Sequence, residues 1–402
     1  MTRWGGALAL GAGVTAAAFA FGSPPLGLMG IGLLLAGAGT RAWAGLAGSG
    51  AALAFRVASS PVTEGDRVRL SVVARRDSGV PVGSVVVAGT LGRLGPLELR
   101  LRGSGREASG ELQLGSVPRG VYRLDEPRVV LGDFLGLTAV SPRVRLESDT
   151  LVARPRLAQL DALFSDAGRF SGDGRRLLLR RSAGFDFHSV REYEQGESLR
   201  RVHWPTSARR GQLMVKELED RTRDGVVVLL DCDPRGVAGE PPDSSFDVSV
   251  RAAGSLLAAH AGRGRAATLV TTGSDRSALQ VRLGEGDLDA ALVVLAAAEP
   301  DAAAPVSRAL AGGSTAASRA GELMVVTAML DTRTTTALLD AGQRQLVSVV
   351  WVDAPSYVGR PTRVNPHALR LAAAGVPVAA VRRGDDLAVA LGSHGREAAV
   401  GG

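Results

Sequence analysis

Lysine and aromatic residues are scarce in this sequence, and their scarcity argues against one class of partner. The 402 residues include 47 lysines and arginines and carry a net charge of +7, yet Lys216 is the one lysine. The arginines are spread through every segment of the chain. Aromatic residues make up 4% of it, too few to supply the stacking platforms that a single-strand binder places beside its cations. We therefore predict no nucleic-acid partner.

Cysteine is scarce as well, and several catalytic motifs are missing. Cys232 is the one cysteine, so a disulfide within the chain and a cysteine-rich zinc site are excluded, which suits a reducing compartment. A phosphate-binding P-loop needs Gly-Lys-Ser/Thr, but Lys216 stands between valine and glutamate. The sequence has no Gly-x-Ser-x-Gly elbow, no His-Glu-x-x-His and no Gly-x-Gly-x-x-Gly after a strand. No small-molecule substrate is identified by these patterns.

Two uncharged apolar runs, 4–22 and 25–40, open the chain and are separated by Ser-Pro-Pro. About 20 helical residues cross a bilayer core. The first run is long enough, and the second is when it continues to Gly48 with Arg41 extended to the interface. A cleaved signal peptide is the alternative, but it needs no second apolar run. We predict that residues 1–50 form two transmembrane helices.

Basic residues predict the orientation of this hairpin. Arg3 precedes the first helix, Arg41 and Arg56 follow the second, and the turn between the helices is uncharged. Because basic flanks stay on the cytoplasmic side, both ends are expected there. The prediction is a multi-pass protein of the cell membrane, the plasma membrane, with a cytoplasmic body.

The rest of the chain changes its pattern between two regions. Residues 51–155 contain short alternating runs broken by Gly, Pro and Asp, which is typical of an antiparallel β-sandwich. Residues 225–402 alternate apolar strands with helical stretches, which predicts a doubly wound, mostly parallel α/β domain. The overall prediction is an α+β multidomain chain. Ligands of such sheets lie at the carboxyl ends of strands, here Asp231, Asp233 and Asp331.

The intervening segment 156–224 is neither alternating nor cleanly helical, and it is too charged for a core. Arg and carboxylate residues alternate in it around Trp204. Three interpretations stay open: an ion-pair seam that fastens the two domains with Trp204 as its apolar plug, a protein-docking surface, or a catalytic site. His188 and His203 flank the charges and are either a ligand or acid–base pair in the folded chain or ordinary polar packing residues, and we favour the packing role.

The stretch from Gly184 to Glu219, GFDFHSVREYEQGESLRRVHWPTSARRGQLMVKELE, resembles the charged motif of the domain-of-unknown-function 58 family. Asp186 replaces the usual Glu and Glu197 the usual Asp. Upstream, RGVYRL and GDFLGL resemble two further signatures of that family, the second in a looser form. The motif residues are Asp186, Arg191, Glu192, Tyr193, Gly196, Glu197, Arg201, Trp204 and Arg209.

The resemblance implies a membrane hairpin, a β-rich region and a von Willebrand A-like, Rossmann-type α/β domain. It also implies the company of MoxR-type AAA+ ATPases and no enzymatic activity. Domains of the von Willebrand A kind begin a metal-binding Asp-x-Ser-x-Ser loop where this chain has Asp231, with Asp233 and Arg235 in place of the serines. Mg²⁺ prefers oxygen ligands, and an arginine there repels it. Thr327 or Asp331 are the candidate additional ligands, and Asp231 with Asp233 is a weak metal site.

The sequence therefore favours a membrane-anchored, non-enzymatic adaptor or scaffold that works with an AAA+ ATPase in envelope or stress-related assembly. No cofactor is expected, with Mg²⁺ as the weak exception. One alternative is a metal-dependent hydrolase that uses Asp231, Asp233 and His203. The other is a metal-dependent adhesion-type binding module on the outer side of the membrane.

Overall fold

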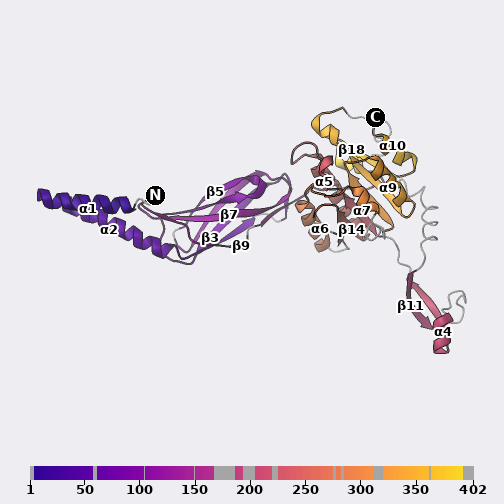
Figure 1. Cartoon of the computed structure of the whole chain (residues 1–402), viewed down its shortest axis with the longest axis horizontal. Coiled ribbons are helices and arrows are strands. Elements are labelled where there is room, and N and C mark those ends of the chain that lie inside the picture. The colour runs from indigo at the N-terminus through magenta and orange to yellow at the C-terminus, as the bar shows by residue number, and fades with distance from the viewer. Residues whose placement is uncertain are drawn as a thin grey trace. The chain divides into compact units, whose positions relative to one another are not determined.

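The structure, a computed structural model, comprises two compact units, Met1–Arg156 and Leu157–Gly402, which are described separately (Figure 1). The residues that it describes are 4–57, 61–103, 105–148, 150–166, 186–192, 204–219, 225–274, 278–281, 285–311, 320–361 and 364–392.

The first unit opens with the predicted pair of apolar helices, α1 (Trp4–Phe21) and α2 (Pro24–Ala47). Both are long and apolar enough to cross a membrane. They pack so closely that a Cβ added to Gly30 would lie 2.7 Å from the backbone nitrogen of Thr15. Small residues at such contacts are typical of helix pairs in membranes. At the open end of the hairpin, the Arg41 guanidinium lies 5.5 Å from the centre of the Trp4 ring.

A curled mixed β domain completes the first unit. Sheet order is β6-β3-β1-β9 in one sheet and β2-β10-β7-β4-β5 in the other, with β8 paired to β7. Side chains from both sheets, such as Leu70 and Val129, are fully buried in one shared core. The strands are β1 (Ala51–Val57), β2 (Val62–Thr63), β3 (Arg67–Arg76), β4 (Ser84–Leu91), β5 (Pro96–Leu101), β6 (Glu107–Ser116), β7 (Gly120–Gly132), β8 (Ala139–Val140), β9 (Val144–Ser148) and β10 (Thr150–Arg154), with the 3₁₀ turn η1 (Gly92–Leu94) between β4 and β5.

The expectation of a purely antiparallel arrangement is wrong for two strand pairs. β1 runs parallel to β9, and β10 runs parallel to β2. Alternation of apolar and polar residues has period two in either kind of ladder. It therefore identified the strands and their buried faces but carried no information on the direction of a partner far away in the sequence.

The second unit is built on a sheet in the order β15-β14-β13-β16-β17-β18, in which β15 alone is antiparallel to its neighbour. Its strands are β13 (Val226–Leu230), β14 (Ala267–Thr271), β15 (Ala278–Val281), β16 (Glu322–Thr327), β17 (Leu346–Val352) and β18 (Val378–Val381). All five residues of β13, which are consecutive apolar residues, are buried. The parallel α/β domain is thus confirmed, and its antiparallel edge is an addition.

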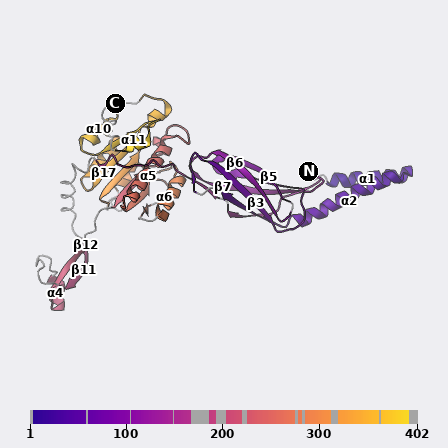
Figure 2. The same ribbon diagram turned by 180° about the vertical axis from the view of Figure 1, so that it is seen from behind.

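Helices cover both faces of this sheet (Figures 1 and 2). The helices are α5 (Ser245–Gly262), α6 (Glu285–Ala297), α7 (Val306–Ala311), α9 (Thr332–Gly342), α10 (Pro366–Ala373) and α11 (Leu387–Leu391), with 3₁₀ turns η3 (Pro234–Gly236) and η4 (Ala354–Val358). Helices α5, α6 and α11 share a core with Val228 of β13, and α7, α9 and α10 share the opposite core with Leu229. A capping box formed by Ser244 and Asp247 starts α5.

The segment between the domains differs from its prediction at both ends. Leu163 and Phe164 are fully buried in the α5 core, and Asp166 forms an ion pair of 2.9 Å with Arg263 at the end of α5. The expectation that this segment holds no core residue is therefore wrong. Further along, β11 (Asp186–Glu192) and β12 (Met214–Glu219) form an antiparallel pair, with α4 (Trp204–Arg210) between them in sequence.

Candidate functional site

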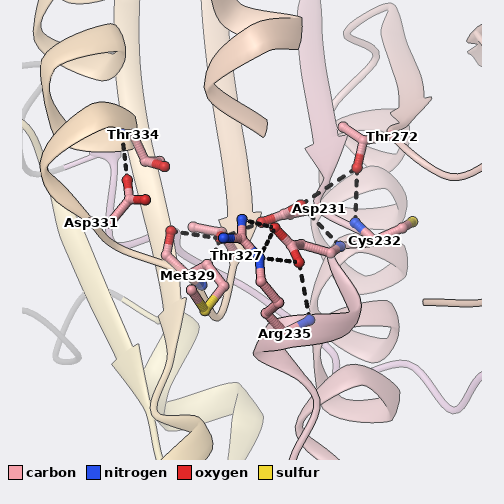
Figure 3. A network of polar contacts seen from close by, with 9 residues as sticks. Asp231, Cys232, Arg235, Thr272, Thr327, Met329, Asp331 and Thr334 are labelled. Atoms are coloured by element: carbon pink, nitrogen blue, oxygen red, sulfur yellow. Dashed lines mark hydrogen bonds and ion pairs between the residues drawn. The ribbon is translucent and has the colours of Figure 1, made fainter. Parts of the chain in front are cut away.

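The candidate site lies where the strand order of the parallel sheet reverses. β13 is followed in the chain by β14 on one side, while β16 lies on its other side and continues to β17 and β18. Loops diverge at the carboxyl edge of such a pair, and ligands of open α/β sheets bind there. Asp231 follows β13, Thr327 ends β16 and Asp331 caps the start of α9, as the sequence predicted for this edge (Figure 3).

Asp231 is buried, with 6% of its surface exposed. Its Oδ2 accepts a hydrogen bond of 2.6 Å from the hydroxyl of Thr327, and its Oδ1 accepts one of 3.2 Å from the backbone N–H of Asp233. A longer bond of 3.4 Å comes from Thr272 at the end of β14. Burial raises the pKa of Asp231 to about 6, because it disfavours the charged form more than these donors favour it. Asp231 therefore exchanges a proton just below neutral pH.

Asp233 is held by a different partner, the guanidinium of Arg235. The Arg235 Nε lies 3.0 Å from one carboxylate oxygen of Asp233, and Nη2 lies 2.6 Å from the other. The backbone N–H of Arg235 donates to the same carboxylate at 3.0 Å. These hydrogen bonds lower the pKa of Asp233. A bidentate pair of this kind neutralises the carboxylate within its own turn.

Two further groups at this edge have structural roles. Asp331 accepts a hydrogen bond of 2.7 Å from the backbone N–H of Thr334 and so caps α9. Burial acts to raise the pKa of Asp331, but the bonds from Thr334 and the charge of Arg235 outweigh it, and its pKa is lowered. Cys232 is buried, and burial raises the pKa of its thiol to about 11. A thiol that keeps its proton at neutral pH is a poor nucleophile.

These residues do not fit a Mg²⁺ ion. Mg²⁺ requires oxygen ligands with free lone pairs around it. Both oxygens of Asp233 are engaged by Arg235, whose cationic group lies where a metal would need the carboxylate. Among the residues that the structure describes, no group of three or more His, Cys, Asp or Glu side chains could hold a metal ion. His203, which the hydrolase alternative needs, lies outside the described residues.

The structure describes part of the charged motif. Asp186, Arg191 and Glu192 lie on β11, where Asp186 pairs with Glu219 and Arg191 with Val215 of β12. The remaining motif residues divide into two groups: Trp204 and Arg209 lie on α4, whereas Tyr193, Gly196, Glu197 and Arg201 lie outside the described residues.

The side chain of Ser207 fixes helix α4 to β12. The Ser207 hydroxyl accepts a hydrogen bond of 2.8 Å from the backbone N–H of Met214, and both residues are buried. Trp204 at the start of α4 is 62% exposed. That Trp204 plugs an apolar seam between the two domains stays a prediction.

Two features of the site were not predicted from the sequence. Thr272 follows β14 and reaches Asp231, a contact that the end of a third parallel strand at the same edge would have indicated. The closed pair of Asp233 and Arg235 was read only as a repulsion of metal, since a side-chain fork within one turn has no sequence pattern.

Comparison with known proteins agrees with the motif. Residues 189–358 match the family described as "Protein of unknown function DUF58". The "Uncharacterized protein YeaD" of Bacillus subtilis (strain 168) is 28% identical over 253 residues, which span 61% of this chain and 61% of that protein.

The similarities to solved structures are weak. A CARDB domain from Pyrococcus furiosus has a TM-score of 0.16 at 13% identity, over 24% of this chain and 86% of that one. Cwp6 from Clostridium difficile has a TM-score of 0.20 at 10% identity, over 74% of this chain and 37% of that one. From its motif, its family match and its distant homology to YeaD, this chain belongs to the DUF58 family.

Proposed function

We propose that this protein is a membrane-anchored, non-enzymatic scaffold with a von Willebrand A-like domain that docks a protein partner, most plausibly an AAA+ ATPase of the MoxR type. The membrane is the plasma membrane, and the body faces the cytoplasm. The process served is envelope or stress-related assembly. The observation that carries the proposal is the closed pair of Asp233 and Arg235 at the ligand edge of the sheet.

That pair supports a scaffold because it occupies the place of a ligand loop. A catalytic or metal-binding carboxylate needs an oxygen that is free to meet substrate or metal. Both carboxylate oxygens of Asp233 accept hydrogen bonds from Arg235, and one oxygen of Asp331 accepts a hydrogen bond at the start of α9. The buried thiol of Cys232 is protonated at neutral pH, since burial raises its pKa to about 11.

The anchor is supported by the apolar surface of the two helices. Phe19, Phe21 and Leu28 are 85%, 78% and 73% exposed. Apolar patches of this kind on a soluble protein would be a liability for aggregation, whereas lipid covers them at no cost. Arg41 in the C-terminal half of α2 and Arg56 in β1 favour a cytoplasmic body.

The docking surface that we propose is α4. Trp204 is 62% exposed there, and Arg209 and Arg210 are exposed in the last turn of the helix. Trp and Arg are the residue types that dominate binding energy at protein interfaces. Ser207 fixes the helix to β12, so these side chains are presented on a held element.

The test is retention of an AAA+ ATPase by the detergent-solubilised full chain. We expect Trp204→Ala with Arg209→Ala to lower retention at least tenfold, or ~1.4 kcal/mol and more. Arg100→Ala, an exposed arginine on β5, is the matched control and should retain the partner fully. Unchanged retention by the folded double variant would remove α4 as the docking surface.

One observation favours a second candidate, a metal-dependent hydrolase: the pKa of Asp231 is about 6, within the range of an acid–base group. Calorimetry with Mg²⁺, Mn²⁺ and Zn²⁺ separates the two functions. Micromolar binding that Asp231→Ala abolishes would favour the hydrolase. The scaffold predicts no such binding to the wild-type chain or the variant.

A further inference from the structure

The turn between β7 and β8 exposes two large apolar side chains that belong neither to the candidate site nor to the proposed docking surface on α4. Phe134 is 67% exposed and Leu135 is 62% exposed. The turn is well held, because the buried carboxylate of Asp133 accepts a hydrogen bond of 3.0 Å from the backbone N–H of Leu137. Gly136 adopts the left-handed conformation that closes it, with φ of +65°. This is the GDFLGL stretch noted above.

A short chain of contacts places this turn at the helical end of the β domain. On α2, the Trp43 indole donates a hydrogen bond of 2.8 Å to the carbonyl of Pro81. Two residues further on, Gly83 is hydrogen-bonded to Gly132, and a Cβ added to Gly83 would lie 2.9 Å from the Cα of Phe134. Strand β8, which follows the turn, also lies against α2. The turn and the end of α2 therefore occupy the same end of the domain.

The helical hairpin indicates at which level of the bilayer this end of the β domain lies. Trp4 and Arg41 stack on each other at the open end, and Trp43 follows within the same turn of α2. Trp and Arg at the end of an apolar helix mark the headgroup level. The 18 residues of α1 span about 27 Å, close to the thickness of a hydrocarbon core. Pro81, bonded to Trp43, thus lies at the level of the headgroups.

We propose that the Phe134–Leu135 turn inserts into the headgroup region of the bilayer that holds the hairpin. This inference rests on the membrane anchor of the proposed function. Lipid is the occupant because the apolar turn is continuous with the apolar helices through Trp43 and Pro81. Arg143 is exposed close by, its carbonyl accepting a hydrogen bond of 2.9 Å from Ala51 at the start of β1, and its charge suits anionic headgroups.

The consequence is a fixed orientation of the β domain on the membrane. A single helical hairpin leaves the attached domain free to rotate about its exit point. Two contacts, one through α2 and one through the turn, restrict that rotation. Because the hairpin already holds the turn near the surface, the second contact forms within one molecule and benefits from a high effective concentration.

The experiment uses the full chain in vesicles of phosphatidylcholine and phosphatidylglycerol. Leu135→Cys carries an environment-sensitive fluorophore, and spin-labelled lipids are the quencher. Native Cys232 does not compete for the label, because it is 1% exposed and its pKa is raised to about 11. The matched control is Thr90→Cys, which is exposed at the opposite end of β4, where the strand pairs with Asp125 rather than with Gly132.

We expect blue-shifted emission and loss of most of the fluorescence at position 135, with little change at position 90. Adding Phe134→Ser should lower the quenching at 135 several-fold, because it removes the larger apolar group from the turn. Flotation of the chain with the vesicles reports the anchor separately. Flotation without quenching at 135, or with equal quenching at 90, overturns the inference and leaves the anchor. Failure to float overturns both.

Discussion

Asp231 keeps its proton to a higher pH than an exposed aspartate because the sheet edge buries it. Its pKa rises from 3.8 to about 6 on folding. A raised pKa means that the folded state binds the proton more tightly than the unfolded chain. The stability that this gives is fully present below pH 3.8 and is lost as the pH rises to about 6. At neutral pH the ionised group therefore destabilises the α/β domain by ~3 kcal/mol.

Asp231→Asn should remove this pH dependence. The amide has the same shape and keeps an oxygen for the hydroxyl of Thr327, but it no longer accepts from the backbone N–H of Asp233. We therefore expect higher stability than wild type at pH 7.5 by ~1–2 kcal/mol, less than the full ~3 kcal/mol. Thermal unfolding of both proteins between pH 3.5 and 7.5, in steps of about half a pH unit, measures the difference.

The matched control for this prediction is Asp331→Asn. The pKa of Asp331 is lowered in the folded state, so its contribution has the opposite sign and the variant should be less stable at pH 7.5. A stability difference between Asp231→Asn and wild type that does not change with pH would contradict the raised pKa of Asp231.

At the scale of elements, the helical hairpin depends on where its glycines lie. A Cβ on Gly30 meets the backbone of Thr15, whereas one on Gly32 meets nothing within 4 Å. Gly30→Leu should therefore push α1 and α2 apart and destabilise their packing by ~1–3 kcal/mol, while Gly32→Leu on the open face is neutral.

A disulfide between Ala18→Cys and Gly27→Cys measures this packing. A Cβ on Gly27 would lie 3.8 Å from that of Ala18, the usual separation in a disulfide. We expect oxidation of the pair to slow several-fold in the presence of Gly30→Leu and to be unaffected by Gly32→Leu. Equal rates in the two backgrounds would show that the helices are not packed through Gly30.

How far the sequence predicted these elements depended on their length and on their partners. β13 could be predicted because five consecutive apolar residues are typical of a strand that is buried on both faces. Asp231 could be predicted as a site residue because ligands of parallel sheets lie at the carboxyl ends of strands. Leu163 and Phe164 could not, since two buried residues beside a charged segment are too few to show a period. The parallel pairing of β1 with β9 was hidden because partner direction leaves no mark on alternation.

At the scale of the whole molecule, the two units have separate cores. Phe164 packs with α5 and β13, and the β domain buries Leu70 and Val129 in a core of its own. Phe164→Ala should cost about 3–5 kcal/mol in the α/β unit and nothing in the β domain. Hydrogen exchange measured peptide by peptide should accelerate in β13 and α5 and stay unchanged in β3 and β7. Equal acceleration in both units would mean that they unfold as one.

The proposed membrane topology of the whole chain rests on three arginines. Arg3 precedes α1, Arg41 lies in the C-terminal half of α2 and Arg56 follows in β1, whereas Gly22 and Ser23 between the helices carry no charge. A green fluorescent protein fused after the last residue should fluoresce, because that reporter folds in the cytoplasm, and an alkaline phosphatase fusion should be inactive. Replacing the three arginines by Ala and placing two lysines in the Gly22–Ser23 turn reverses the basic bias. This variant should show phosphatase activity, since charge next to the helices sets orientation. Phosphatase activity in the unaltered chain would place the body outside, and an ATPase of the cytoplasm would then have no access to Trp204.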